Sequence, residues 1–138
     1  MRHEDCWAKK ANDGSTGMSV AQHCRIVGSV ARELLKRVPG CVVRVLPECS
    51  ATIAACHDVG KVSPGFQKKI APDHVARLAP HLTNQSLAGF VTSHAEIGQS
   101  TVNRFLAERF RLACAAAVVG AHHGFWQTGS RTDEKGAY

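Results

Sequence analysis

AACHDVGK, residues 54–61, places a histidine and an aspartate side by side, followed closely by a glycine and a lysine. The doublet His57-Asp58 is a weak signal on its own. It gains weight from further histidines along the chain, which are His23, His94, His122 and His123. These five imidazoles and one carboxylate are enough ligands for two transition-metal ions that share a bridging oxygen. The sequence therefore predicts a metal-dependent phosphoesterase.

The composition is that of a folded domain. The chain has 138 residues, of which 44% are hydrophobic and 20% are charged, and this suits one compact domain with its own core. We expect residues 1–127 to form that domain and the polar residues 128–138 to be a flexible tail. No apolar run approaches the roughly 20 residues needed to span a bilayer, and no apolar segment typical of a secretory signal follows the N-terminus. We therefore expect a cytoplasmic protein without membrane contact.

The six cysteines form no CxxC pair, and several lie within helical patterns. In a reducing compartment such residues behave as small buried hydrophobes. Zinc ligation would require the paired spacing that is missing here. The cysteines are therefore predicted to be free thiols without a metal.

The chain carries a net charge of +6 at pH 7, and its Arg and Lys residues are spread along its length. This charge is compatible with a polyanionic partner such as nucleic acid. A solvated basic surface explains the same charge equally well. Charge alone does not choose between the two.

Apolar residues recur at helical spacing, which predicts an all-α bundle. Ser19 resembles a helix N-cap, and the helix after it is predicted to end at Pro39-Gly40. Its inward stripe would consist of Val20, His23, Val27, Val30 and Leu34. A second helix is predicted from about residue 50 to residue 59, with Gly60 as its left-handed stop.

Three more helices are predicted further along the chain. Ser63-Pro64 would open a short helix that runs through Ile70. Short helices and loops are expected over residues 71–92. Ser93 would cap a long helix with His94, Ile97, Thr101 and Phe105 on one face. The last helix, over residues 112–122, would carry Ala115, Val118, Val119 and His122 as its stripe and end at Gly124.

In this arrangement His23 and His57 face inward, and Asp58 falls in the last turn of a helix. The helix dipole disfavours an anion there, which suggests that a cation lies nearby. Each residue also has an ordinary interpretation. His23 would be a core histidine, Asp58 would cap a neighbouring element, and Lys61 would be a surface lysine at a helix end.

Histidine nitrogens with a carboxylate suit Mn, Fe, Co, Ni or Zn better than Mg or Ca, and we expect one or two such ions. Two ions about 4 Å apart can activate water for attack on a phosphodiester and stabilise the leaving oxygen. Asp58 is the natural bridge between them, and Lys61 would neutralise charge on the phosphate. We therefore assign catalytic roles to His57, Asp58 and Lys61.

HDVGKVSPGFQ, residues 57–67, resembles the HD-GK-x-x-P-x-F-Q signature of one branch of the HD superfamily. That branch is the HD nuclease domain of the type I CRISPR effector nuclease-helicase. WAKK at residues 7–10, His23, His94 and AHHG at residues 121–124 also match this branch in order. The similarity covers most of the chain.

The resemblance implies a helical HD fold that cuts single-stranded DNA with a divalent transition metal. It also implies a helicase domain or subunit and a CRISPR guide complex as partners. In the family, residues matching His23, His57 and Asp58 hold one metal, together with a carboxylate much further along. Residues matching Asp58, His94, His122 and His123 hold the second metal.

The chain departs from the family pattern after His123. No counterpart of the distal carboxylate appears before Tyr138, and Asp133 follows His123 too soon to replace it. We therefore expect a partial domain in which the second metal position is the better occupied. Apolar surface exposed by such a truncation would favour pairing with a second copy. Two alternative functions are a phosphohydrolase that acts on small nucleotides and a catalytically impaired metal-binding fragment.

Overall fold

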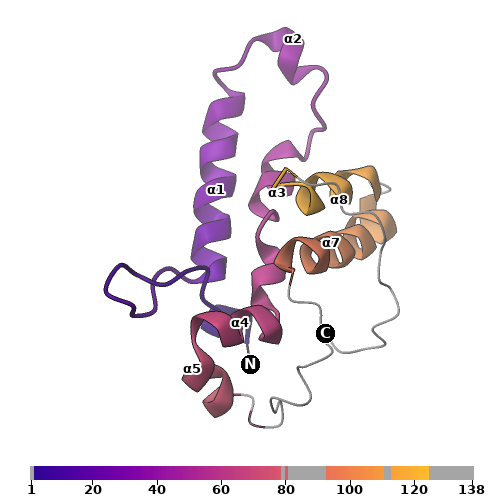
Figure 1. Ribbon diagram of the computed structural model, residues 1–138. Helices are drawn as coiled ribbons and strands as arrows, with labels where there is room; N and C mark the ends of the chain where they lie inside the picture. Colours follow the sequence, from indigo (N-terminus) through magenta and orange to yellow (C-terminus); the bar gives the residue numbers. More distant parts are fainter. Residues whose placement is uncertain (1, 79, 81–92, 111–112, 125–138) are drawn as a thin grey trace.

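The computed structural model describes residues 2–78, 80, 93–110 and 113–124, and within these ranges the chain is helical (Figure 1). In chain order the α-helices (α) and 3-10 helices (η) are η1 (His3–Asp5), α1 (Val20–Leu35), α2 (Gly40–Val43), α3 (Ser50–Ala55), η2 (Val59–Val62), α4 (Pro64–Ile70), α5 (Pro72–Leu78), α7 (His94–Phe110) and α8 (Ala113–Gly120). The described ranges contain no β-strand beyond two isolated bridges, Trp7 with Ser19 and Lys10 with Thr16. The all-α prediction is confirmed.

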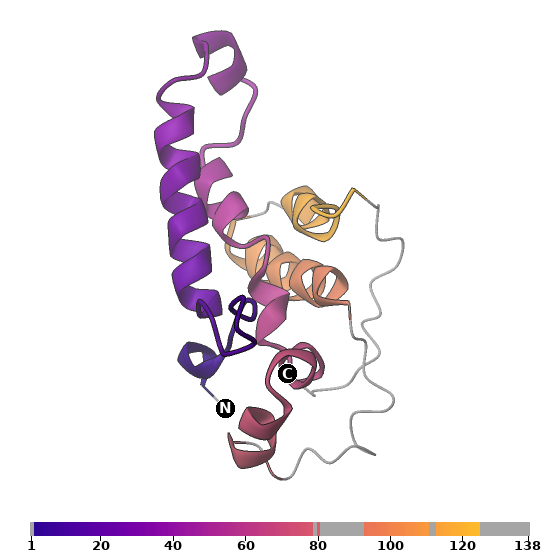
Figure 2. The same cartoon turned by 60° about the vertical axis from the view of Figure 1, so that its left-hand side comes forward.

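Two pairs of helices sit on either side of the segment that carries the doublet. Helix α1 packs along α3, and α7 packs along α8 and against η2 (Figures 1 and 2). The far end of α1 projects beyond the rest of the molecule, and α2 lies where the chain turns back from it. No described helix is both long and apolar enough to cross a membrane. Residues 81–92 and the predicted tail 128–138 lie outside the described residues.

Serine side chains cap three of the helices where the sequence predicts it. Ser19 Oγ accepts from the backbone N–H of Gln22 at 3.1 Å, and Ser63 Oγ accepts from that of Phe66 at 3.4 Å, with a proline in the first turn. Ser93 Oγ accepts from the N–H of Glu96 at 3.4 Å. Each hydroxyl satisfies one of the free N–H groups that a helix start leaves.

The helix before the doublet is shorter than predicted. α3 ends at Ala55, and a turn at residues 56–58 leads into η2, so Asp58 lies beyond the helix and precedes η2. Gly60 is not a left-handed stop, because among the described glycines only Gly14 and Gly124 have positive φ. Gly124, where the last helix is predicted to end, has a φ of 81°, although α8 itself ends at Gly120.

Gly60 is instead required by a close contact between two elements. A Cβ atom at this position would collide with the backbone carbonyl oxygen of His94 and would lie 2.6 Å from the N atom of Gly98. Because Gly60 lacks a side chain, η2 can rest directly on the first turns of α7. This approach brings Asp58 and His94 together.

Several residues of the predicted stripes face solvent. Val30 and Leu34 on α1 are 53% and 57% exposed, and Phe105 on α7 and Val118 on α8 are also exposed. Among the α7 side chains that the structure describes, residues 94–105, the buried ones are instead Ala95, Gly98 and Val102. The predicted stripe of α7 was therefore displaced by one residue.

Small residues decide which helix faces meet. On α1, Gly28 is buried against α3, and a Cβ added there would lie 3.0 Å from the Cβ atom of Ala55. On α7 the same role falls to Ala95 and Gly98. Burying a large aliphatic side chain is favourable, but close helix approach favours small ones. The apolar periodicity follows the large residues, so it did not identify these faces.

Two clusters of buried side chains form most of the core in the described part of the chain. Ile53, Val102, Ala115, Ala116 and Val119 join α3, α7 and α8. Cys6, Ala8 and Val20 join the N-terminal segment to α1, with Cys24 and Val62 packed against them. Small apolar residues dominate both clusters, in keeping with a chain of which only 6% is aromatic. The chain between the two clusters carries the His57-Asp58 doublet.

The cysteines whose side chains are described are free thiols, as predicted, and they are Cys6, Cys24, Cys41, Cys49 and Cys56. Burial raises the pKa of both Cys6 and Cys24 to about 11. These thiols stay protonated at neutral pH and are therefore poor metal ligands. The side chain of Cys114 lies outside the described part of the chain.

The contact at Gly60 predicts the effect of a substitution there. Gly60→Ala should lower the free energy of unfolding by about 2 kcal/mol, because α7 must move away from the new Cβ. The matched control is Gly40→Ala, because a Cβ at Gly40 meets nothing within 4 Å. Replacing a helical glycine by alanine should raise the free energy of unfolding by about 0.5 kcal/mol. Urea denaturation of both variants measures the difference. Equal stability of the two variants would contradict the close packing of η2 on α7.

Candidate metal centre

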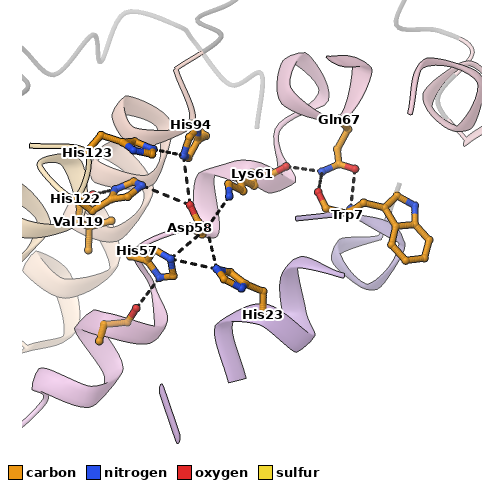
Figure 3. Close-up of polar contacts among 11 residues, drawn as sticks. Trp7, His23, His57, Asp58, Lys61, Gln67, His94, Val119, His122 and His123 are labelled. Carbon is orange, nitrogen blue, oxygen red and sulfur yellow. Dashed lines mark hydrogen bonds and ion pairs between the residues drawn. The ribbon is translucent and has the colours of Figure 1, made fainter. Parts of the chain in front are cut away.

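Six side chains that are distant in the sequence converge at one place between the helices (Figure 3). His23 lies in the first turn of α1, and His57 and Asp58 lie in the turn between α3 and η2. His94 is the first residue of α7, and His122-His123 follow the end of α8. The structure thus brings together all the residues that the sequence predicts as metal ligands.

Asp58 lies at the centre of this group and is 4% exposed. Its Oδ2 atom is 2.7 Å from Lys61 Nζ, 3.0 Å from His23 Nε2 and 3.1 Å from His57 Nε2. Its Oδ1 atom faces the other side, 3.3 Å from His94 Nε2 and 3.5 Å from His122 Nε2. The two oxygens of one carboxylate therefore face two different groups of histidines.

The possible ligand atoms form two compact sets. His23, His57 and Asp58 make one set, and His94, His122 and His123 make the other, with the atoms of each set within 4.8 Å of one another. Nε2 of His23 lies 3.3 Å from Nε2 of His57. Nε2 of His123 lies 2.9 Å from Nε2 of His94. Each set is small enough to surround a single ion.

Backbone carbonyls orient two of these imidazoles. His57 donates its Nδ1–H to the carbonyl of Ala54 at 2.8 Å, and His122 donates its Nδ1–H to the carbonyl of Val119 at 2.5 Å. In the neutral ring the remaining nitrogen, Nε2, then carries a lone pair. A second N–H bound to a carbonyl is the arrangement typical of metal-ligating histidines.

The lone pairs on the Nε2 atoms of His57 and His122 indicate that a cation can lie between the side chains. Nε2 of His122 is buried without a hydrogen-bond donor, and it faces a carboxylate oxygen rather than a donor. Lone pairs that approach one another or a carboxylate repel unless a proton or a metal ion lies between them. Imidazole nitrogens and one carboxylate form a donor set suited to divalent transition metals. The residues present therefore fit such an ion.

Burial and charge keep the site in the protonation states that ligation requires. Burial lowers the pKa of His94 to about 4 and also lowers that of His23, although Asp58 opposes both shifts. Burial favours the neutral form of Asp58, but the hydrogen bond and charge of Lys61, with His57 and His94, outweigh it and lower the pKa of Asp58. At neutral pH, His23 and His94 are neutral and Asp58 is ionised.

The contacts of Asp58, Lys61 and His23 meet at one centre. Asp58 precedes η2, but its side chain makes no capping hydrogen bond. The side chain of Lys61 is only 17% exposed and pairs with Asp58. The hydrogen-bond and ion-pair partners of His23 are His57 and Asp58. His23 and Lys61 thus both contact Asp58 Oδ2 at the common centre.

Two neighbours of the centre received no role from the sequence. The Phe66 ring lies 5.1 Å from the His94 ring between centroids, and Lys61 Nζ lies 5.6 Å from the Phe66 centroid. Gln67 is fully buried and hydrogen-bonds to two backbone segments. Phe66 and Gln67 both belong to the HDVGKVSPGFQ segment at residues 57–67, whose likeness to the family signature could have indicated a role for them.

Comparison with known proteins identifies a family. A family model described as "Cas3, HD domain" matches residues 7–138. The chain belongs to this family. No curated protein and no solved structure matched the chain. Membership makes the protein an HD domain of the Cas3 nuclease-helicase type, which implies a metal-dependent nuclease acting in the context of single-stranded DNA and a helicase domain. The resemblance noted in the sequence is confirmed.

The lowered pKa of His94 predicts how the stability of the metal-free HD domain depends on pH. Unfolded His94 takes up a proton near pH 6.5, whereas the folded protein takes it up only near pH 4. Between these values the unfolded state binds more protons, so the free energy of unfolding falls as pH is lowered from 7 to 4. One such proton corresponds to a slope of about 1.4 kcal/mol per pH unit.

Urea denaturation at a series of pH values, with a chelator present, measures this slope. His94→Gln should flatten it between pH 6.5 and 4. His3→Gln, at an exposed histidine of η1, should leave it unchanged. The same slope in His94→Gln and in the native protein would contradict a buried neutral His94.

Proposed function

We propose that this HD domain is a nuclease that cuts single-stranded DNA in CRISPR interference by hydrolysis with two divalent transition-metal ions. One observation carries the proposal: two sets of histidines face the two oxygens of a single buried carboxylate, Asp58. A shared carboxylate between two sets of ligands is the arrangement of two-ion phosphodiesterases.

The geometry suggests how the ligands are divided. His23, His57 and Oδ2 of Asp58 would hold one ion. Oδ1 of Asp58 with His94, His122 and His123 would hold the other. When bound, the two ions supply a water activated for attack and stabilise charge on the attacked phosphate. The ligands suit Mn, Fe, Co, Ni or Zn.

Residues beside the ligands would act on the substrate. Lys61 places an ammonium group 2.7 Å from Asp58 Oδ2, where it can neutralise charge on a phosphate oxygen bound beside this carboxylate. His57 and Asp58 would hold the ions in place and so fix the position of the attacking water. The hydrogen bond of His57 to the carbonyl of Ala54 keeps the imidazole in the orientation that this requires. We therefore assign the catalytic roles to His57, Asp58 and Lys61.

The partners would be single-stranded DNA, a helicase domain or subunit and a CRISPR guide complex. Exposed aliphatic side chains on α1 and on α2 support a protein contact, and they include Ile26, Val30, Leu34, Val42 and Val43. A second copy of the chain is another candidate for this surface. The free thiols are compatible with the reducing cytoplasm, where we place the protein.

Metal titration tests the division of ligands. Calorimetry with Mn, Co, Ni or Zn should show two ions per chain, and Mg should bind more weakly. His23→Ala should remove the weaker ion and His122→Ala the tighter one, because the latter position has three imidazoles. His3→Ala should bind both ions normally. Loss of both ions in each single variant would contradict two separate positions.

Nuclease assays test the activity. The native protein should cleave single-stranded DNA when a transition metal is added. His57→Ala and Asp58→Ala should lower the rate by at least about 100-fold, since each removes a ligand and misplaces an ion. His3→Ala is the matched control and should cleave normally.

Two results would favour the alternative functions. Hydrolysis of nucleotides without cleavage of a polymer would indicate a small-nucleotide phosphohydrolase. Stoichiometric metal binding without turnover of any phosphoester would indicate a catalytically impaired metal-binding fragment. Either result would reject the nuclease.

A further inference from the structure

Gln67 on α4 joins two backbone segments that are far apart in the sequence (Figure 3). Its side chain is 0% exposed. Oε1 accepts from the N–H of Trp7 at 2.8 Å, and Nε2 donates to the carbonyl of Trp7 at 2.9 Å and to that of Lys61 at 2.6 Å. Both N–H groups of the amide are used, so its burial leaves no donor unsatisfied.

The bonds to Trp7 attach the N-terminal segment. Trp7 forms a bridge with Ser19, and the N–H of Val20 donates to the carbonyl of Cys6 at 2.8 Å. These contacts hold the N-terminal segment against the start of α1. The two hydrogen bonds between Gln67 and Trp7 therefore have a structural role. This role does not require the third bond of Gln67, to Lys61.

The third bond goes to the backbone of a residue at the centre. The N–H of Lys61 donates to the carbonyl of Asp58 at 3.0 Å, and Lys61 Nζ donates to Asp58 Oδ2 at 2.7 Å. A lysine side chain has four rotatable bonds and loses much conformational entropy when it is held in one place. Holding the backbone of Lys61 reduces the positions that its ammonium group can reach.

We propose that Gln67 is a positioning residue that holds the Lys61 backbone so that the Lys61 ammonium stays on Asp58. In the part of the chain that the structure describes, the side-chain hydrogen bonds of Gln67 go to Trp7 and Lys61 and not to a ligand histidine, so Gln67 would act through Lys61. Catalytic side chains need support from surrounding hydrogen bonds to keep their geometry. The inference rests on the proposed function, because that function gives Lys61 its catalytic role.

Chemical labelling tests the positioning without reference to activity. Gln67→Met keeps the size of the side chain but removes its two N–H donors and the Oε1 acceptor. In the metal-free variant, acetylation of Lys61, followed by mass spectrometry, should be at least about fivefold faster than in the native protein. Lys36, whose side chain is 63% exposed and pairs with Glu33, is the internal reference and should react at one rate throughout.

Val20→Ala is the matched control for lost stability. It removes methyl groups from the cluster of Cys6, Ala8 and Val20 and leaves the bond between Gln67 and Lys61 in place. Lys61 should react in this variant within about twofold of the native rate. Unchanged labelling in Gln67→Met, or equal acceleration in Val20→Ala, would overturn the proposal.

A double-mutant cycle tests whether Gln67 acts through Lys61. Gln67→Met should lower kcat for DNA cleavage in the native background and should cause no further loss in Lys61→Met. Equal losses in both backgrounds would overturn the proposal. If the native protein cleaves no DNA, the proposed function fails, and the labelling experiment still decides the role of Gln67.

A measurement on the native protein covers the case in which Gln67→Met does not fold. A scalar coupling across the hydrogen bond from Gln67 Nε2 to the Lys61 carbonyl should be visible by NMR. The side-chain amide protons of Gln67 should also exchange slowly with solvent. Fast exchange without the coupling would overturn the proposal.

Discussion

The burial of Asp58 among five imidazoles is the constraint on which the rest of the structure depends. An ionised carboxylate away from water needs compensating positive charge or hydrogen bonds. Lys61 Nζ supplies part of this at 2.7 Å, but the facing histidine nitrogens include lone pairs that cannot. A divalent ion would complete the compensation, which is why the donor set of this site suits a metal.

This constraint explains several features that would otherwise seem unrelated. The candidate ligands come from α1, from the turn after α3, from the start of α7 and from the turn after α8, so these elements must meet at one place. Gly60 allows η2 to rest on α7. The two small cores on either side hold α1 with the N-terminal segment, and α3 with α7 and α8. The fold positions ligands rather than enclosing one large core.

Side chains next to the ligands complete the arrangement. Backbone carbonyls of Ala54 and Val119 set the orientation of two rings, so the helices preceding His57 and His122 also determine where the ring nitrogens point. Gln67 links the N-terminal segment to η2. These hydrogen bonds explain how short helices and small cores can hold several imidazoles in fixed orientations around one site.

The sequence alone determined which ligand atoms the protein offers and that its secondary structure is helical. Residue identities set the donor set, and serine caps, proline and apolar periodicity depend on neighbours only a few residues away. The tertiary structure alone decided the inner faces of α1 and α7, the role of Gly60 and the partners of Gln67. These depend on how closely two distant backbones approach, and that distance follows from side-chain volumes on both partners, which periodicity along one segment does not contain.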